Sequence, residues 1–120
     1  MAGMVQFVAR YISDGRYLDY TAGADLAAGD VVVVGELVGV AVQPLAAGQT
    51  DGLCVEGVID FAKATGNGTA IAGGVLLYWD ATAKVATTNA GGGANKYIGK
   101  SVFAGATDSA AVVRVRFHPL

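Results

Sequence analysis

The segment Val31-Val32-Val33-Val34-Gly35-Glu36-Leu37-Val38-Gly39-Val40-Ala41-Val42 sets the fold class of this 120-residue chain. Two valine-rich runs flank a glycine, and β-branched side chains favour extended backbone. Glycine supplies the positive φ that a two-residue hairpin turn requires. We therefore predict a β-hairpin with arms at Val31–Val34 and Leu37–Val42. Both arms are apolar on both faces, so each face should be covered by the rest of the domain or by a neighbouring subunit.

Short β-branched and aromatic runs recur on both sides of this hairpin, between Gly, Asp and Asn residues that are typical of turns. None has the apolar spacing of a helix over about ten or more residues. Beyond the hairpin we predict strands at Val5–Tyr11, Arg16–Thr21, Leu53–Phe61, Val75–Asp80, Lys84–Thr87, Lys96–Phe103 and Val112–Phe117. Ala22–Gly29 and Ala104–Ala111 could each hold a turn of helix, and Asn89–Asn95 should be a flexible loop. The predicted class is all-β with at most one short helix, in a compact β-barrel-like or β-sandwich-like domain.

The C-terminal run has the clearest strand pattern in the chain. Val113, Val115 and Phe117 alternate with Arg114 and Arg116. This period of two is expected of a strand with one buried and one exposed face. We predict that the two arginines lie on the exposed face.

Small side chains dominate the apolar part of the composition. Hydrophobic residues make up 53% of the chain, mostly as Ala and Val, and there are 18 Gly. A domain of this length buries roughly two-thirds of the surface that its unfolded chain exposes, and these side chains give it a thin core. Contacts between subunits would be a second source of burial. The single cysteine, Cys54, lies in an apolar run and is predicted to be a small buried hydrophobe rather than a reactive thiol.

Charged residues are sparse, at 15% of the chain, and the formal net charge is −2. Nucleic-acid binding depends on many Lys and Arg side chains, so this composition argues against a nucleic-acid partner. The apolar region Val31–Val42 is interrupted by Glu36 and two glycines, and is shorter than the roughly 18 residues of a membrane helix. The N-terminus lacks the basic start and long apolar run of a signal peptide. We expect a soluble protein with no membrane partner, made in a cytoplasm.

The most suggestive chemical motif is Ala94-Asn95-Lys96-Tyr97-Ile98-Gly99-Lys100-Ser101, which fits a relaxed phosphate-loop pattern. A phosphate loop follows a buried strand and opens a helix whose N-terminal amides hold the phosphates. Here a Gly- and Asn-rich loop precedes the motif, and the residues after it indicate strand and turn. A strand-rich chain without convincing helices also lacks the α/β sheet of a nucleotide hydrolase. We expect no nucleotide cofactor.

Residues that usually perform catalysis or bind metals are few or dispersed. The only histidine, His118, lies beside Pro119 near the C-terminus, and one His with one Cys cannot assemble a zinc site. The eight Asp and two Glu mostly neighbour turn-forming residues, which explains them better than a catalytic carboxylate pair does. We predict no catalytic residue, no metal site and no cofactor.

Five blocks of the sequence, taken in order, resemble the bacteriophage capsid cement, or head decoration, protein family. They are Gly29–Ala41, Glu56–Ala64, Ala72–Ala81, Tyr97–Val102 and Val113–Phe117. The resemblance rests on the Gly-Asp…Gly…Val-Gly-Val hairpin, the Glu-Gly-Val strand and the Leu-Tyr-Trp-Asp turn together, and covers roughly residues 16–120. Some members of this family also have a RecA/RadA-type recombinase label, which the residues here do not support.

The resemblance implies a compact β domain that assembles as a homotrimer on the outside of a tailed-phage head. Its partner would be the major capsid protein, at three-fold and quasi-three-fold junctions. There the trimer would bury additional surface and stabilise the shell. The chain would then be a structural component of the virion, made in the cytoplasm of the bacterial host, and not an enzyme.

Residues 1–15 match the family least, and we interpret them as an N-terminal arm ahead of a single decoration domain at residues 16–120. Val5, Phe7, Ala9 and Tyr11 share one face of the predicted first strand. Such a segment could pair with an exposed strand of the capsid protein through main-chain hydrogen bonds. The candidate capsid-contact residues are Met4, Val5, Gln6, Phe7, Val8, Arg10 and Tyr11.

Two other functions remain open on the sequence. A β-rich module of a phage tail or other surface structure would recognise a host molecule instead of a capsid. A nucleotide-dependent recombination enzyme would bind ATP and lose that binding on Lys100→Ala, whereas we expect no ATP binding.

Overall fold

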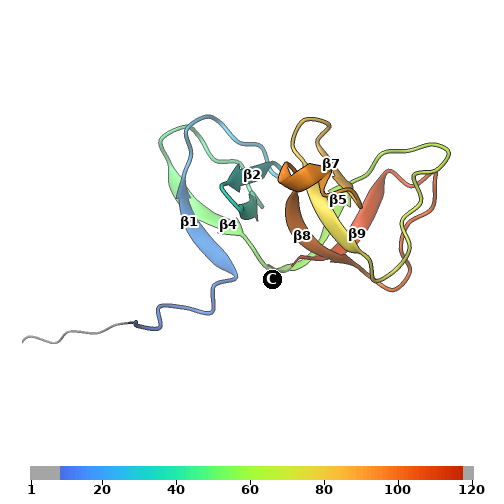
Figure 1. Ribbon diagram of the computed structural model, residues 1–120. Coiled ribbons are helices and arrows are strands. Elements are labelled where there is room, and N and C mark those ends of the chain that lie inside the picture. The colour runs from blue at the N-terminus through green and yellow to red at the C-terminus, as the bar shows by residue number, and fades with distance from the viewer. Residues whose placement is uncertain (1–8, 118–120) are drawn as a thin grey trace, which may run out of the picture.

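Two antiparallel sheets make up the part of the chain that the computed structural model describes, residues 9–117 (Figure 1). The strands are β1 (Tyr17–Thr21), β2 (Val31–Val34), β3 (Leu37–Val40), β4 (Thr50–Cys54), β5 (Gly57–Ala62), β6 (Leu76–Asp80), β7 (Val85–Thr87), β8 (Lys96–Ser101) and β9 (Val112–Phe117). Within residues 9–117 the only helical segment is one turn of 3₁₀ helix, η1 (Gly91–Gly93). The prediction of an all-β fold with at most one short helix is confirmed.

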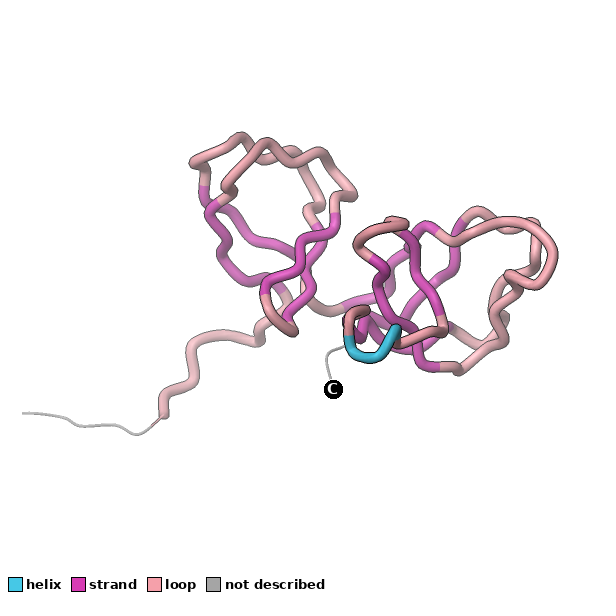
Figure 2. Tube along the Cα trace, turned by 45° about the horizontal axis from the view of Figure 1, so that its top comes forward, coloured by secondary structure: helices cyan, strands magenta, loops and turns pink. Residues whose placement is uncertain are grey.

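The chain completes the first sheet before it begins the second. The first sheet has the strand order β1-β4-β3-β2, and the second has the order β5-β9-β8-β6-β7. Figure 2 shows the two sheets as neighbouring groups of strands joined by a short connection. That connection is Val55-Glu56, between the end of β4 and the start of β5.

The prediction of one continuous strand over Leu53–Phe61 was therefore wrong. Cys54 pairs with Tyr17 in the first sheet, whereas Gly57 pairs with Phe117 in the second. Gly57 has a φ of 143°, which glycine adopts at little cost and other residues rarely adopt. This glycine provides the change of direction between the sheets.

The predicted central hairpin is confirmed as β2 and β3. Its register runs from Val31 opposite Val40 to Val34 opposite Leu37, which leaves Gly35-Glu36 as a two-residue turn. Gly35 has a φ of 59°, whereas the φ of Glu36 is not positive. A positive φ at the first central position alone is the pattern of a type II′ turn. The second arm ends at Val40, two residues earlier than predicted.

One hydrophobic core joins the two sheets. Val38 and Val40 of β3 pack into the same buried cluster as residues of all five strands of the second sheet. Phe61 is central to it, with ring centroids 5.8 Å from Trp79 and 5.4 Å from Phe117. Such tilted and edge-on aromatic pairs are favourable beyond the area that they bury.

The strand at the C-terminal end behaves as its alternation predicts. In β9, Val113, Val115 and Phe117 are buried in the core, and the two arginines between them lie on the exposed face. The prediction for Cys54 is also confirmed, because this cysteine is buried and its thiol donates to the carbonyl of Glu56 at 3.2 Å.

The helical turns suggested at Ala22–Gly29 and Ala104–Ala111 do not form. Leu26 instead makes an isolated antiparallel bridge with Leu45, and Ala106 makes one with Ile71. The single 3₁₀ turn lies in the loop Asn89–Asn95. There the Asn89 side chain accepts from the backbone N–H of Gly91 at 2.8 Å, and the Asn95 amide donates to the carbonyl of Asn89 at 2.9 Å. These local asparagine bonds explain why a glycine-rich loop holds the turn.

The predicted strand at Val5–Tyr11 lies mostly outside the described residues. Ala9, Arg10 and Tyr11 are described and form no strand, so that part of the prediction was wrong. Residues 9–15 lead away from the two sheets (Figure 1), whereas the carbonyl of Arg16 accepts from the N–H of Val55 at 2.9 Å and so continues the pairing of β1 with β4. Strands β2 and β9 have the predicted limits. Strands β1, β6 and β7 each begin one residue later than predicted, and β8 ends two residues earlier.

Candidate interaction surfaces

The predicted capsid-contact residues are only partly described. Met4, Val5, Gln6, Phe7 and Val8 lie outside the described residues, while Arg10 and Tyr11 are exposed in the segment before β1. Tyr11 is 76% exposed and Ile12 is 75% exposed. The Tyr11 hydroxyl donates to the carboxylate of Asp14, and this hydrogen bond raises the pKa of the tyrosine. Two large apolar side chains are thus available to a partner just ahead of the first sheet.

The outward side of the first sheet is an apolar surface, which we call the apolar face. It consists of Leu18, Tyr20, Val32, Val34, Leu37 and Leu53, which line one shallow groove. Leu53 is buried on its floor, whereas Val34 is 58% and Leu37 is 46% exposed. The hairpin was predicted to need cover on both faces. The core covers the side with Val38 and Val40, and the side with Val34 and Leu37 is left open.

Glycine at position 39 keeps the groove of the apolar face open. It pairs with Val32 in the hairpin, and an added Cβ would lie 3.1 Å from the Cβ and Cδ1 of Leu53. Any larger residue here would meet the groove floor. The groove therefore depends on the Val-Gly-Val sequence of β3.

Four exposed residues form a row across the second sheet, which we call the basic row. In strand order they are Leu76, Lys100, Arg116 and Val58, each directly opposite the next in the sheet register. Leu76 is 46% and Val58 is 62% exposed, so apolar side chains flank two cations. Arg116 also lies 3.9 Å from the carboxylate of Glu56, a long ion pair.

A second ion pair lies beside the basic row. Arg114 Nε donates to Asp60 Oδ1 at 2.8 Å, and Arg114 Nη2 donates to Oδ2 at 3.1 Å. This bidentate bond lowers the pKa of the Asp60 carboxyl and raises the pKa of Arg114. The carboxylate of Asp60 thus neutralises the charge of Arg114 on the exposed face of the second sheet.

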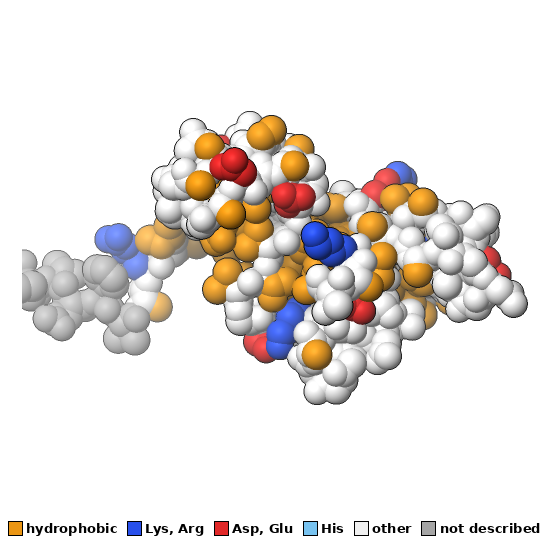
Figure 3. Space-filling view, turned by 90° about the horizontal axis from the view of Figure 1, so that it is seen from above, with side chains coloured by type: hydrophobic (Ala, Val, Ile, Leu, Met, Phe, Trp, Pro, Cys, Tyr) orange, Lys and Arg blue, Asp and Glu red, His pale blue; other side chains and the backbone are white. Residues whose placement is uncertain are grey.

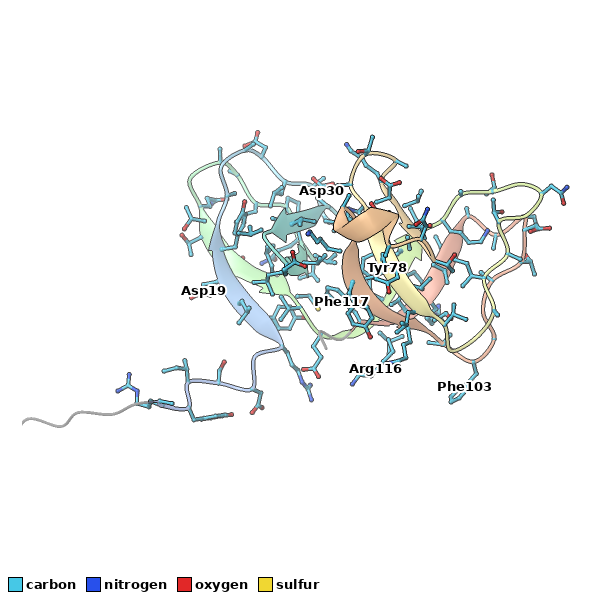
Figure 4. The ribbon with its side chains drawn as sticks, viewed as in Figure 1. Asp19, Asp30, Tyr78, Phe103, Arg116 and Phe117 are labelled. Atoms are coloured by element: carbon cyan, nitrogen blue, oxygen red, sulfur yellow. The ribbon has the colours of Figure 1, made fainter. Side chains whose placement is uncertain are left out.

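Phe103 is the most exposed large apolar side chain among the described residues, with its full surface accessible to solvent. It lies in the turn after β8, and Figure 4 shows it pointing away from the second sheet. Ser101 fixes the turn, because its hydroxyl donates to the carbonyl of Ala72 at 2.6 Å and accepts from Val75 N–H at 3.1 Å. Gly73 packs so closely that an added Cβ would lie 2.0 Å from the Phe103 carbonyl oxygen. An aromatic ring on such a braced turn is suited to anchor a partner.

The two sheets differ strongly in charge. Residues 17–55 contain no Lys or Arg, and their charged residues are Asp19, Asp25, Asp30, Glu36 and Asp51. Residues 57–117 contain six Lys and Arg against three Asp. Seen from above, the molecule has hydrophobic side chains gathered at its surface between scattered charges (Figure 3). The net charge of −2 therefore conceals an acidic first sheet and a basic second sheet.

The phosphate-loop motif has a structural role. Lys96–Ser101 is strand β8, which pairs with β6 on one side and with β9 on the other. Gly99 has a φ of 136°, and an added Cβ would lie 2.1 Å from the carbonyl oxygen of Arg116. The glycine thus permits close strand approach, and the segment does not have the loop-to-helix geometry that binds phosphate.

Within residues 9–117, no group of three or more His, Cys, Asp or Glu side chains is placed to hold a metal ion. No helix in the same range has the length and apolar content to cross a membrane.

Sequence reasoning did not single out Phe103, the basic row or the charge difference between the sheets. The charge difference could have been counted directly, because every Lys and Arg between Tyr17 and Phe117 follows Glu56. A phenylalanine within the turn-forming run Val102-Phe103-Ala104-Gly105 was also a signal of an exposed aromatic. The basic row depends on the pairing of distant strands, which local patterns do not specify.

Comparison with known proteins gives one match. A family model described as phage cement protein matches residues 12–117 of the chain. No curated protein and no solved structure matches. The matched range includes both sheets and Phe103, and it begins after Tyr11, the last of the candidate capsid-contact residues.

Proposed function

The chain belongs to the phage cement protein family, and on this premise we propose that it is a non-enzymatic decoration protein that binds the outer surface of a phage capsid. The family match over residues 12–117 is the observation on which the proposal rests. The exposed apolar face, the basic row and Phe103 support it, because large apolar side chains at a protein surface mark interaction sites.

The proposed mechanism is the addition of buried contact area to an assembled shell. Three copies would sit at a three-fold or quasi-three-fold junction and contact several major capsid subunits at once. A ligand that binds only the assembled state stabilises that state by mass action. No bond is made or broken in this mechanism. The protein would be made in the bacterial host cytoplasm and act on the virion.

The N-terminal arm, residues 1–15, is our candidate for part of the capsid contact. Its sequence places Val5, Phe7, Ala9 and Tyr11 on one face and Gln6 and Arg10 on the other, as in a strand that adds to the edge of another sheet. The described end of the arm supports this role, since Tyr11 and Ile12 are three-quarters exposed on an extended segment. Arg10 would add a charged contact from the opposite face.

Incubation with undecorated, expanded heads tests the function. We expect saturable binding with a copy number in multiples of three. A tail or host-recognition module would instead bind host cells and leave heads bare. Absence of binding to expanded heads would overturn the proposal.

Two variants with the same added charge test the arm. Phe7→Asp places a carboxylate on the apolar side of the arm, and we expect it to weaken head binding at least about tenfold. Thr88→Asp places the same charge at an exposed position outside the arm and should leave binding within about twofold. Equal affinities for both variants would show that the apolar side of the arm does not contact the capsid.

A further inference from the structure

We propose that the apolar face of the first sheet receives the Phe103 turn of a second copy of this chain. This inference rests on the self-association in the proposed function, and it names the two surfaces that make the contact.

Charge complementarity favours a second copy as the partner. The first sheet is acidic and the second is basic, so the first sheet of one copy attracts the second sheet of another. The chain already uses this attraction internally, where Lys96 Nζ of β8 lies 2.7 Å from Glu36 Oε2 at the hairpin turn. Two copies placed with the first sheet of one against the second sheet of the other would repeat this attraction between molecules.

The charges also lie where the contact needs them. Asp51 lies directly opposite Tyr20 in the sheet register, so its carboxylate shares the face of Tyr20 and Leu53 that lines the groove. On the other surface, Lys100 is one residue before the end of β8, and Arg116 lies directly opposite it. Phe103 follows two residues after β8 ends. An apolar anchor with adjacent cations thus matches an apolar groove with an adjacent carboxylate.

The two surfaces cannot meet within one molecule. In Figure 4, Asp19 lies on the first sheet and Phe103 at the far end of the second, on opposite sides of the drawing. The contact therefore joins different patches of two copies and is heterologous. Repetition of a heterologous contact gives a closed ring where the rotation closes, and a trimer is one such ring.

Sedimentation velocity of the free protein, without capsids, tests the contact. At about 0.01 M salt we expect a closed oligomer. It should shift towards monomer as salt rises to about 1 M, because the Debye length falls from about 30 Å to about 3 Å. Phe103→Ala should raise the dissociation constant at least about tenfold. Val42→Ala removes a side chain that is 52% exposed and outside both surfaces, and should leave the constant within about twofold.

A charge exchange provides the sharper test. Lys100→Glu and Asp51→Lys should each weaken association at least about tenfold, and a chain with both substitutions should regain most of it. Lys84→Glu is the control, since Lys84 is exposed on the second sheet side but lies outside the basic row. Rescue by the double variant is not expected if either residue acts only on the fold of its own sheet.

Two results would overturn the inference. One is a wild-type protein that stays monomeric at all concentrations and salts. The other is an oligomer that is indifferent to Phe103→Ala and to both charge reversals. Head binding is measured separately, so the two proposals can fail independently. If the protein binds heads but does not make this contact, only the inference is refuted. If the protein forms the ring but does not bind heads, only the proposed function is refuted.

Discussion

Lys63 shows how a single charged residue organises two loops of the second sheet. It is 5% exposed, and its Nζ donates to the carbonyl of Ala64 at 2.7 Å, to Thr69 Oγ1 at 3.2 Å and to the carbonyl of Ala110 at 3.2 Å. A buried ammonium group is costly unless its donors are satisfied, and here all three have acceptors. Lys63 thereby ties the segment after β5 to the segment before β9.

Lys63→Ala should lower the free energy of unfolding by about 2–4 kcal/mol, because it removes bonds from a charged donor and leaves buried acceptors unpaired. Lys84→Ala at an exposed position should stay within about 0.5 kcal/mol of wild type. Urea unfolding of both variants measures the difference. Equal stabilities would show that Lys63 does not hold the loops.

The ion pair between Asp60 and Arg114 gives a pH dependence with a defined sign. The pair lowers the pKa of Asp60 in the folded protein. Its stabilisation is therefore complete above the unfolded pKa of about 3.9 and disappears as pH falls through the lower folded pKa. We expect wild type to melt above Asp60→Asn at about pH 6, with the difference lost well below pH 4. Arg114→Gln should behave like Asp60→Asn. A difference that persists in strong acid would contradict this assignment.

At the scale of elements, two glycines have different structural tasks. Gly35 needs its positive φ for the hairpin turn, and no atom lies within 4 Å of an added Cβ. Gly99 needs both its φ and the space, because a Cβ there would meet the backbone of β9. Gly35→Ala should therefore cost about 1–2 kcal/mol of backbone strain, and Gly99→Ala should cost more than about 4 kcal/mol or prevent folding. Chemical denaturation compares the two variants, and similar losses would count against strand crowding at Gly99.

Local sequence patterns predicted the elements better than their partners. The hairpin and β9 were predictable because periodicity and turn chemistry are local properties. The break at Val55-Glu56 was not, since the runs on both sides favour strands and only distant pairing assigns them to different sheets.

The turns at Leu26–Asp30 and Leu45–Gln49 were also missed, although both contain Leu-Ala-Ala-Gly. In the first turn the Asp30 carboxylate accepts from the N–H of Ala27 at 2.8 Å. In the second, the side-chain oxygen of Gln49 accepts from the N–H of Ala46 at 2.8 Å.

At the scale of the whole molecule, two sheets share one core, and the first sheet is acidic whereas the second is basic. The thin core expected from small side chains is consistent with this arrangement, because the apolar face and Phe103 stay exposed in a single copy. The class of the fold and the family were predictable from the sequence, and the contact surfaces of the second sheet were not. These surfaces exist only after β5, β9, β8 and β6 align. The arm stays a prediction, because Met4–Val8 lie outside the described residues.

The most direct test of the proposed cement function is the disruption temperature of expanded heads, measured by calorimetry with increasing amounts of the protein. We predict that this temperature rises with occupancy until the sites are saturated, because a decoration protein of the proposed kind would bind the intact shell and not its separated subunits. A disruption temperature that stays unchanged on fully decorated heads would contradict the claim that this chain works by adding buried contacts to an assembly.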